Sequence, residues 1–438
     1  MLNRRQFVQS ATLAGIATTL PHMATSAAAA PQAPQPASFA SLPMLKGQAR
    51  PITNEERWVR IERARALMAQ ERLGAIVLTG GTSLVYYTNL RWGQSERMFA
   101  VVLPAKGNPI IVCPAFEADR AGEQIKTSPL GTGAELLTWE ENESPFDLTA
   151  RALKSRGVAT GRVGIEETVR FVFADSIAQA APAIRFVSAT PVTAGCRMIK
   201  DAHEIELMRL ASKVTLNAYA AAYPGLRDGM TPGDYSALTS AAHQRQGFSG
   251  GGGAQIGPNT SYPHGSAVAQ VVREGAMVLV DGGCSVEGYG SDISRSFVYG
   301  KPSDKMRKVF DLVRRMQLAA LAVAKPGVPL DALDRAARKL AEDEGYGPGF
   351  KFFTHRLGHG LGMDGHEWPY LVEHNMYGWT KTVTLKPGMT FTNEPGIYIP
   401  GEFGIRLEDD MLITENGAEL FTPQSPSIDA PFPGLPVA

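Results

Sequence analysis

The chain of 438 residues carries 43 lysines and arginines and 43 aspartates and glutamates, so its formal net charge at pH 7 is zero. Balanced charge gives no overall field that would attract nucleic acid or an anionic membrane, and we expect neither as a partner. The length exceeds that of one ordinary hydrophobic core, so two domains are predicted. Cys113, Cys196 and Cys284 lie far apart beside apolar residues, which favours buried single thiols over a disulfide framework.

An export signal is predicted at residues 1–30. Arg4 and Arg5 precede the mildly apolar segment 11–20, and the small residues of 24–30 offer cleavage sites. This arrangement resembles a twin-arginine signal, which would place the mature protein in the periplasm; a short amphipathic or disordered leader is the alternative. The apolar segment is too short for a transmembrane helix of about 20 residues, so no stable membrane insertion is expected.

Residues 31–53 are rich in Pro, Ala, Ser and Gln and are predicted to be a linker. Thr53 and Glu56 then form a capping-box pattern that starts a helix. Short β-rich runs follow, separated by glycine and proline turns and by helices, and this alternation predicts an α/β domain over residues 54–195. The expected strands lie at residues 75–79, 99–103, 109–113, 163–165 and 186–188.

The second domain, residues 196–438, is predicted to begin with a long helix that carries Ile205, Met208 and Val214 on one face. Another helix is expected from about residue 303 to 325, with its methionines in the core. The glycines of 250–253 form either a flexible loop or a strand at the edge of a pocket.

Five residues of this second domain could form the ligand set of two divalent metal ions. Asp281 ends an apolar run and Asp292 precedes another, so the two are expected on the strands of one hairpin. The remaining three lie in apolar or glycine-rich segments, where a side chain can be held firmly. The complete set is Asp281, Asp292, His359, Glu394 and Glu408.

Four carboxylates and one imidazole in one pocket would repel one another and raise each other's pKa values, and two divalent cations would balance the four charges. Paired metals can polarise a shared water, so the site is predicted to be hydrolytic. The hard oxygen donors favour Mn²⁺, Co²⁺ or Fe²⁺ over a structural zinc site and leave catalytic Zn²⁺ possible.

Cys284 is a weaker candidate ligand. The histidines His22, His203, His243 and His374 are predicted to be surface or capped residues.

The segments around these residues resemble the creatinase/aminopeptidase P/prolidase family of metallopeptidases, family M24. The order, context and spacing agree, and the resemblance covers residues from about 54 to 425. It implies a creatinase-like α/β amino-terminal domain and an α+β catalytic domain of the pita-bread fold with a curved antiparallel sheet. The matching segments are 280–283 (VDGG), 290–295 (GSDISR), 357–367 (LGHGLGMDGHE), 393–398 (NEPGIY) and 404–410 (GIRLEDD).

The resemblance also implies the roles of the ligands. Asp281 would chelate one metal, His359 and Glu394 the other, and Asp292 and Glu408 would bridge both. A hydroxide between the metals, with Mn²⁺ the first expectation, would attack the scissile carbonyl while Glu394 accepts and donates the proton.

Five further residues match positions of that family around the metal ligands. His264 and His366 correspond to the substrate-facing histidines that stabilise the developing oxyanion. Arg406 and Tyr398 correspond to residues that orient the ligands, and His355 to a position that is often histidine.

The two-domain arrangement resembles that of prolidase and aminopeptidase P, which implies hydrolysis of the peptide bond before proline, by an Xaa-Pro aminopeptidase or an Xaa-Pro dipeptidase. The family resemblance also implies a homo-oligomer (dimer or tetramer). The compact segment between His366 and Glu394 slightly favours aminopeptidase activity on longer peptides with proline at the second position. A non-peptidase reaction on the same scaffold and a catalytically silent binding module are the alternatives. The binding module is disfavoured because all five ligands are present. A lyase reaction is disfavoured because the related lyases carry an aspartate where this chain has Gly283.

Overall fold

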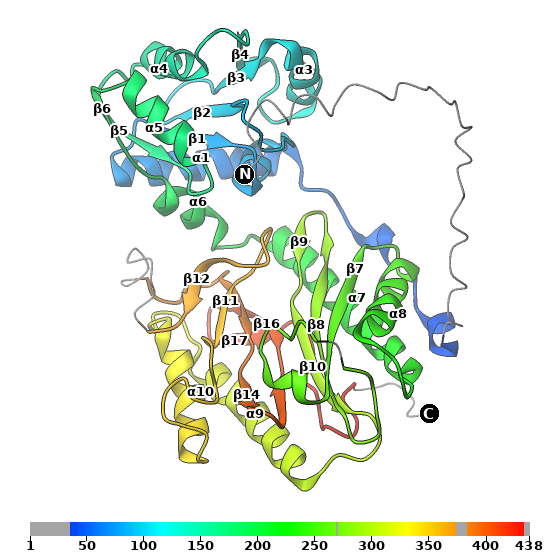
Figure 1. The fold of residues 1–438 in the computed structure, drawn as a ribbon. Helices are drawn as coiled ribbons and strands as arrows, with labels where there is room; N and C mark the ends of the chain where they lie inside the picture. The colour runs from blue at the N-terminus through cyan, green and yellow to red at the C-terminus, as the bar shows by residue number, and fades with distance from the viewer. Residues whose placement is uncertain (1–35, 269, 374–382, 433–438) are drawn as a thin grey trace, which may run out of the picture. The chain divides into compact units, whose positions relative to one another are not determined.

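The amino-terminal domain is built on a six-stranded mixed sheet in the order β4-β3-β2-β1-β5-β6 (Figure 1). The computed structural model describes residues 36–438 except 269, 374–382 and 433–438, so the predicted export signal, His22 and His374 lie outside the described residues. The strands are β1 (Ala75–Thr79), β2 (Ala100–Pro104), β3 (Ile110–Pro114), β4 (Glu135–Trp139), β5 (Gly161–Ile165) and β6 (Ile184–Ser188).

Six helices cover both faces of this sheet. Side chains alternate across each central strand, so Ile76 and Leu78 pack with α1, α3 and α6, whereas Ala75 and Val77 pack with α4 and α5. Burial on both faces explains why these strands are continuous apolar runs. The helices are α1 (Asn54–Glu71), α2 (Thr82–Thr88), α3 (Ala118–Thr127), α4 (Pro145–Ser155), α5 (Phe171–Ala180) and α6 (Thr190–Arg197).

Helix α1 begins as predicted. The Thr53 hydroxyl accepts a hydrogen bond from the Glu56 amide, and the Glu56 carboxylate accepts one from the Thr53 amide, which completes the capping box. The expected α/β character of this domain is confirmed. Strand β4 was not expected, because its exposed polar residues Glu135 and Thr138 hide its apolar pattern.

Helices α7 (Ala202–Ala222) and α8 (Pro232–Arg245) begin the second domain and pack against an antiparallel sheet. That sheet has the order β10-β8-β7, with β9 paired to β8. Its strands are β7 (Gly250–Ile256), β8 (Met277–Val286), β9 (Tyr289–Gly290) and β10 (Ile293–Val298).

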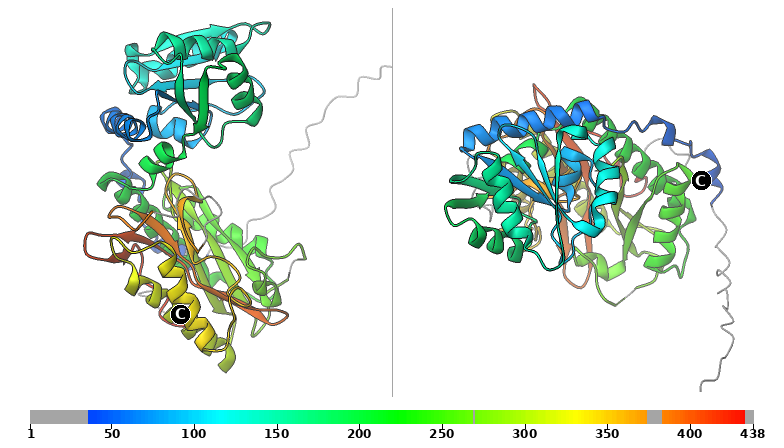
Figure 2. Two further views of the ribbon diagram at one scale, coloured as in Figure 1. Left: turned by 90° about the vertical axis from the view of Figure 1, so that its left-hand side faces the viewer. Right: turned by 90° about the horizontal axis from the view of Figure 1, so that it is seen from above.

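A second antiparallel sheet, in the order β12-β11-β13-β16-β17, packs on α9 (Asp304–Val323) and α10 (Asp331–Asp343) (Figure 2). Met316 is buried in this core, as predicted for the methionines of α9. The strands are β11 (Gly358–Gly360), β12 (Glu367–Leu371), β13 (Thr390–Asn393), β16 (Asp409–Ile413) and β17 (Ala418–Leu420), and the hairpin β14 (Gly396–Ile399) and β15 (Phe403–Arg406) stands beside them. The antiparallel sheets expected in the second domain are confirmed.

Two expectations about single residues have clear outcomes. The three cysteines are buried free thiols, as predicted. The prediction that His243 lies at the surface or in a cap is wrong, because its ring is fully buried between the Thr239 carbonyl (2.8 Å) and the Thr215 hydroxyl (3.3 Å). Its two ring nitrogens are satisfied inside the core, which removes the usual cost of burying a polar group.

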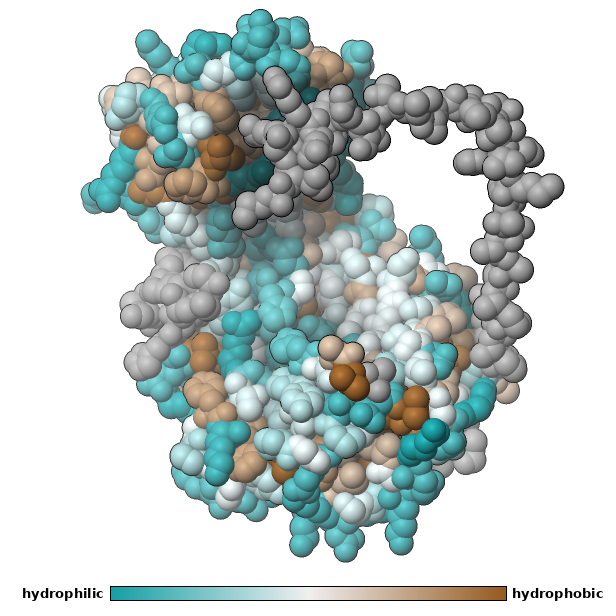
Figure 3. Space-filling model, viewed as in Figure 1, coloured by the Kyte–Doolittle hydropathy of each residue, from teal (hydrophilic) through white to brown (hydrophobic). Residues whose placement is uncertain are grey.

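None of the helices in the described part of the chain has the length and hydrophobicity needed to cross a membrane. On the face shown in Figure 3, hydrophobic residues are scattered among hydrophilic ones and form no continuous apolar band.

Candidate metal centre

Two of the five predicted ligands come from the hairpin of β8 and β10, as expected. Asp281 lies inside β8, opposite Ser294 of β10 and Gly253 of β7, and Asp292 directly precedes β10. The strand does not end at Asp281 as its apolar run suggested, but continues to Val286. Glycine permits this course: a Cβ at Gly283 would lie 1.8 Å from the Ser291 carbonyl oxygen, so no larger residue fits there.

The other three ligands come from the second sheet. His359 is the central residue of β11, Glu394 directly follows β13, and Glu408 directly precedes β16. A Cβ at Gly358 would lie 2.1 Å from the Thr392 carbonyl oxygen, so glycine beside His359 lets β11 lie close to β13.

The structure brings all five predicted ligands together. The Nε2 of His359 lies 3.3 Å from Glu394 Oε1 and 3.8 Å from Asp292 Oδ2. The donor atoms form three groups, and within each group the atoms lie within 4.8 Å of one another. Each of the five predicted ligands belongs to at least one group: Asp292–His359–His366, His359–Glu394–Glu408 and Asp281–Asp292–Glu408. Donors that each lie about 2.1 Å from one ion are roughly 3–3.5 Å apart, so these separations suit shared cations.

The protonation equilibria of the site also fit cation binding. Burial, together with the charge of Asp281, raises the pKa of Asp292 well above its usual range, and burial and the charge of Asp292 do the same to Glu408. Burial raises the pKa of Glu394 to about 7. The carboxylates therefore cannot all ionise at neutral pH without a compensating positive charge, and two divalent ions would provide it.

The histidine ligand is held in the form that binds metal. Burial lowers the pKa of His359 to about 3, so the ring is neutral. Its Nδ1 lies 3.1 Å from the Gly360 carbonyl oxygen, which requires the proton on Nδ1 and leaves the Nε2 lone pair facing the carboxylates.

Arg406 and Ser294 support the carboxylates. Arg406 Nη2 lies 2.5 Å from Asp281 Oδ2, and its Nε donates to the Ser294 hydroxyl at 2.9 Å. That hydroxyl lies 2.8 Å from Asp281 Oδ1 and 2.6 Å from Glu408 Oε2. Ser294 was not among the predicted site residues, although it lies in the segment 290–295; a serine within a buried strand gives no signal of this contact.

Tyr398 and His355 form a connected pair at the edge of the centre. The Tyr398 hydroxyl donates to His355 Nε2 at 2.8 Å, since His355 Nδ1 donates to the Arg356 carbonyl at 2.7 Å. The same hydroxyl accepts from Arg406 Nη1 at 3.3 Å. His355 Nδ1 is 4.0 Å from Glu394, so this histidine lies beside the ligands without belonging to one of the three donor groups.

The two predicted substrate-facing histidines line a cavity of about 440 Å³ that contains the five ligands. The His366 ring stacks on that of His359, with centroids 3.7 Å apart. Arg356 Nη2 donates to His366 Nδ1 at 3.1 Å, which leaves the proton on Nε2 as a donor. His264 is exposed on the loop that follows the 3₁₀ helix Gly257–Ser261.

Two charged groups near His366 were missed from the sequence. Arg356 lines the cavity, and Glu367 is buried in contact with Arg197 and with Lys200, whose Nζ lies 2.6 Å from Glu367 Oε1. Glu367 is held by residues about 170 positions earlier in the chain, and Arg356 meets His366, ten positions later, only through the fold of the residues between them, so neither position has a local sequence signal. Cys284 contacts the Ala211 carbonyl and belongs to none of the three donor groups among the described residues.

The metal-free protein is expected to lose thermal stability as the pH rises from about 6.5 to 8. Groups with a raised folded-state pKa bind extra protons in the folded protein, so their ionisation at higher pH costs stability; here these are Asp292, Glu394 and Glu408. Below pH 6.5 the neutral buried histidines act in the opposite direction, which sets the lower limit of the window. Melting temperatures measured in EDTA and in Mn²⁺ test this, since cations should abolish the decline. A melting temperature that rises with pH in EDTA over this window would contradict the prediction.

The fold and site define a class of protein: a metal-dependent hydrolase in which an α/β domain is followed in the chain by antiparallel sheets that carry the predicted ligands. Comparison with known proteins gives the family. Residues 206–415 match the model of metallopeptidase family M24, and residues 60–199 match the creatinase/prolidase N-terminal domain. The chain belongs to metallopeptidase family M24.

Individual relatives are similar over nearly their whole length. A probable dipeptidase PepE of Mycobacterium tuberculosis is 33% identical over 82% of this chain and 92% of its own. An Xaa-Pro dipeptidase of Lactobacillus helveticus is 31% identical over 78% of this chain and 90% of its own. The crystal structure of the dipeptidase PepE from Mycobacterium ulcerans, 31% identical, superposes with a TM-score of 0.78 over 85% of this chain and 97% of that one. The predicted class, a metallopeptidase of the Xaa-Pro peptidase type, is confirmed.

Proposed function

We propose that this enzyme hydrolyses Xaa-Pro dipeptides, and that Arg356 recognises their carboxylate. Arg356 lines the metal cavity, with its guanidinium 4.1 Å from the centroid of the Tyr370 ring and bonded to His366. A guanidinium binds a carboxylate by charge-assisted hydrogen bonds, and only a dipeptide has a carboxylate directly after the proline. Relatives named Xaa-Pro dipeptidase support this choice, which reverses the slight preference for aminopeptidase activity.

The five ligands would hold two divalent ions, for which we propose Mn²⁺ because four of the donors are hard carboxylates. When bound, these ions would polarise the scissile carbonyl and lower the pKa of a water molecule. Glu394 accepts the proton of the attacking water and delivers it to the proline nitrogen, which becomes the amine of the product. His366 Nε2–H and His264 donate to the carbonyl oxygen as negative charge develops on it.

A comparison of matched substrates tests the proposal. Ala-Pro, Ala-Pro-Ala and Ala-Ala are assayed with enzyme loaded with Mn²⁺, Co²⁺ or Zn²⁺, and we expect Ala-Pro to have the highest kcat/KM, with Mn²⁺ the most effective ion. Equal rates with Ala-Pro and Ala-Ala would refute a proline-directed peptidase. A higher kcat/KM for Ala-Pro-Ala would refute the dipeptide preference.

Arg356→Leu is expected to lower kcat/KM for Ala-Pro by roughly 10- to 100-fold, since a hydrogen bond to a charged group contributes about 1.5–3 kcal/mol. Arg356→Lys keeps the charge and should lose less. The tripeptide, whose proline carbonyl is uncharged, should be affected much less than Ala-Pro. Parallel losses for the dipeptide and the tripeptide would show that Arg356 supports His366 and does not bind the carboxylate.

We also propose that residues 1–30 direct export to the periplasm by the twin-arginine route and that the mature enzyme is a homo-oligomer. The paired residues Arg4 and Arg5 support the first proposal. Cell fractionation of wild type and Arg4→Lys/Arg5→Lys tests it, and unchanged export of the variant would refute it.

Sedimentation velocity tests the proposal that the mature enzyme is a homo-oligomer, which a monomer would refute.

A further inference from the structure

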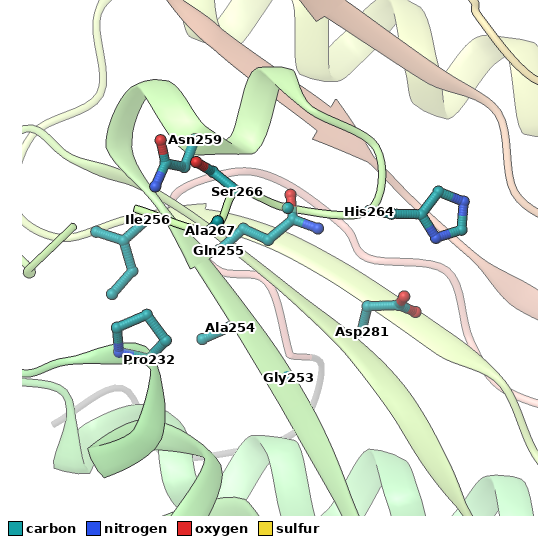
Figure 4. Close-up of a pocket in the computed structure, with 11 residues that line it drawn as sticks. Pro232, Gly253, Ala254, Gln255, Ile256, Asn259, His264, Ser266, Ala267 and Asp281 are labelled. Atoms are coloured by element: carbon teal, nitrogen blue, oxygen red, sulfur yellow. The ribbon is translucent and has the colours of Figure 1, made fainter. Parts of the chain in front are cut away.

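A second cavity, of about 430 Å³, adjoins the metal centre. It shares His264 and Asp281 with the metal cavity and is otherwise lined by β7, Asn259, the loop 265–267 and the start of α8. Figure 4 shows His264 and Asp281 at one end of this cavity and Pro232, Ile256 and Asn259 at the other. The cavity therefore opens from the reaction centre toward β7.

Hydrogen bonds hold the wall that faces β7. Gln255 of β7 donates through Nε2 to the Pro263 carbonyl at 3.1 Å, and Arg406 Nη1 donates to the same carbonyl at 3.0 Å. Asn259 Nδ2 donates to the Val268 carbonyl at 2.5 Å. The loop that carries His264 is thus tied to β7 on one side and to the arginine beside Asp281 on the other.

Close packing explains some, but not all, of the four glycines of β7 (residues 250–253). A Cβ at Gly250 or Gly252 would lie 2.5–2.7 Å from ring atoms of His243 or Tyr219, so close packing requires glycine at these two positions. A Cβ at Gly251 would meet only the Ser240 hydroxyl closely, at 2.8 Å, and that hydroxyl can rotate away. A Cβ at Gly253 would have only the Asp281 carbonyl oxygen within 4 Å, at 3.7 Å. Neither packing nor a left-handed backbone conformation requires glycine at position 253.

The direction of a side chain at position 253 follows from the register. Gly253 lies directly opposite Asp281 in the antiparallel pair of β7 and β8, and residues opposite each other in such a pair project from the same face. Gly253 and Asp281 both line the second cavity. A side chain at position 253 would therefore occupy the cavity, and its absence keeps the cavity open.

We propose that this cavity receives the side chain of the residue before proline and that Gly253 sets the size that it accepts. The assignment rests on the proposed function: Arg356, in the metal cavity, binds the carboxylate of the proline, so the preceding residue extends past the shared His264 and Asp281. Those two are the only ionisable residues among the described residues that line the second cavity, and no lysine or arginine is among them. The cavity therefore takes uncharged side chains, including large ones, in preference to acidic ones.

The test compares Ala-Pro with Leu-Pro in wild type and in Gly253→Leu. We expect the variant to lose at least tenfold more kcat/KM on Leu-Pro than on Ala-Pro, with Gly253→Val intermediate. Gly122→Leu, at a glycine of α3 that has no atom within 4 Å of an added Cβ, serves as the matched control and should leave both substrates unaffected. Bound metal and the melting temperature are measured for each variant, and Gly253→Ala replaces any variant that fails to fold.

Equal losses on the two substrates, or an unchanged ratio, would overturn the role of Gly253. Wild-type enzyme should also hydrolyse Asn-Pro at least tenfold faster than Asp-Pro, and similar rates would overturn the preference for uncharged side chains. Wild-type enzyme that hydrolyses none of these dipeptides would instead refute the proposed function, so the two failures are distinguishable.

Discussion

Replacing Asp292 with asparagine is expected to lower kcat/KM for Ala-Pro by more than about 100-fold, since losing even a residue that only orients a metal ligand typically costs 10- to 100-fold. Asp292 belongs to two of the three donor groups, and its Oδ2 lies 3.8 Å from His359 Nε2. The amide is nearly isosteric but lacks the charge that would balance a divalent ion. Kinetics and metal content, measured by mass spectrometry, check the result.

The same substitution should have the opposite effect on the stability of the metal-free protein. Because Asp292, Glu394 and Glu408 disfavour one another's ionised forms, removal of one carboxylate should raise the melting temperature in EDTA at pH 8 while reducing the stabilisation by Mn²⁺. Asp311→Asn, on the exposed face of α9, is the matched control and should change neither property. Wild-type activity in Asp292→Asn would overturn the dinuclear mechanism.

Replacing Arg295 with methionine is expected to cost about 3–5 kcal/mol of unfolding free energy, the range for breaking a buried ion pair. Neither Arg295 nor Asp409 has an exposed side chain, and Arg295 Nη2 lies 2.6 Å from Asp409 Oδ1. Arg295 Nη1 also donates to the Glu408 carbonyl at 2.7 Å, so the substitution removes a support of a metal ligand. Urea denaturation with and without Mn²⁺ measures the loss.

The double variant Arg295→Met/Asp409→Asn separates the charge from the packing. It removes the unpaired buried carboxylate, and the amide oxygen that replaces it can still accept a hydrogen bond from the Thr422 hydroxyl, so it should recover part of the lost stability. A loss below about 1 kcal/mol in Arg295→Met, or no recovery in the double variant, would show that the Arg295–Asp409 ion pair does not stabilise the packing of β10 against β16.

The elements that were predicted correctly have local causes. The capping box of Thr53 and Glu56 and the apolar run of β1 are written within a few neighbouring residues, and both appear in the structure. Strand β4 was missed because it lies at the edge of the sheet, where Glu135 and Thr138 face solvent. His243 was misjudged because its burial depends on the packing of α8 against α7, which brings Thr215, 28 residues earlier, to its ring; the other partner, Thr239, lies one turn earlier on α8 itself.

The chemistry of this protein can be predicted from its residues alone. Five residues of the right types in the right order predict a carboxylate-rich site for two divalent ions, because four like charges in one pocket need cations to balance them. The residues proposed to contact the substrate could be found only from the folded structure. The supports of Asp281 and Glu408 and the open face of Gly253 arise from segments that are distant in the chain, and the contact of Arg356 with His366 depends on how the chain folds between residues ten positions apart. Their roles depend on distances across paired strands and loops, which no local pattern of residues records.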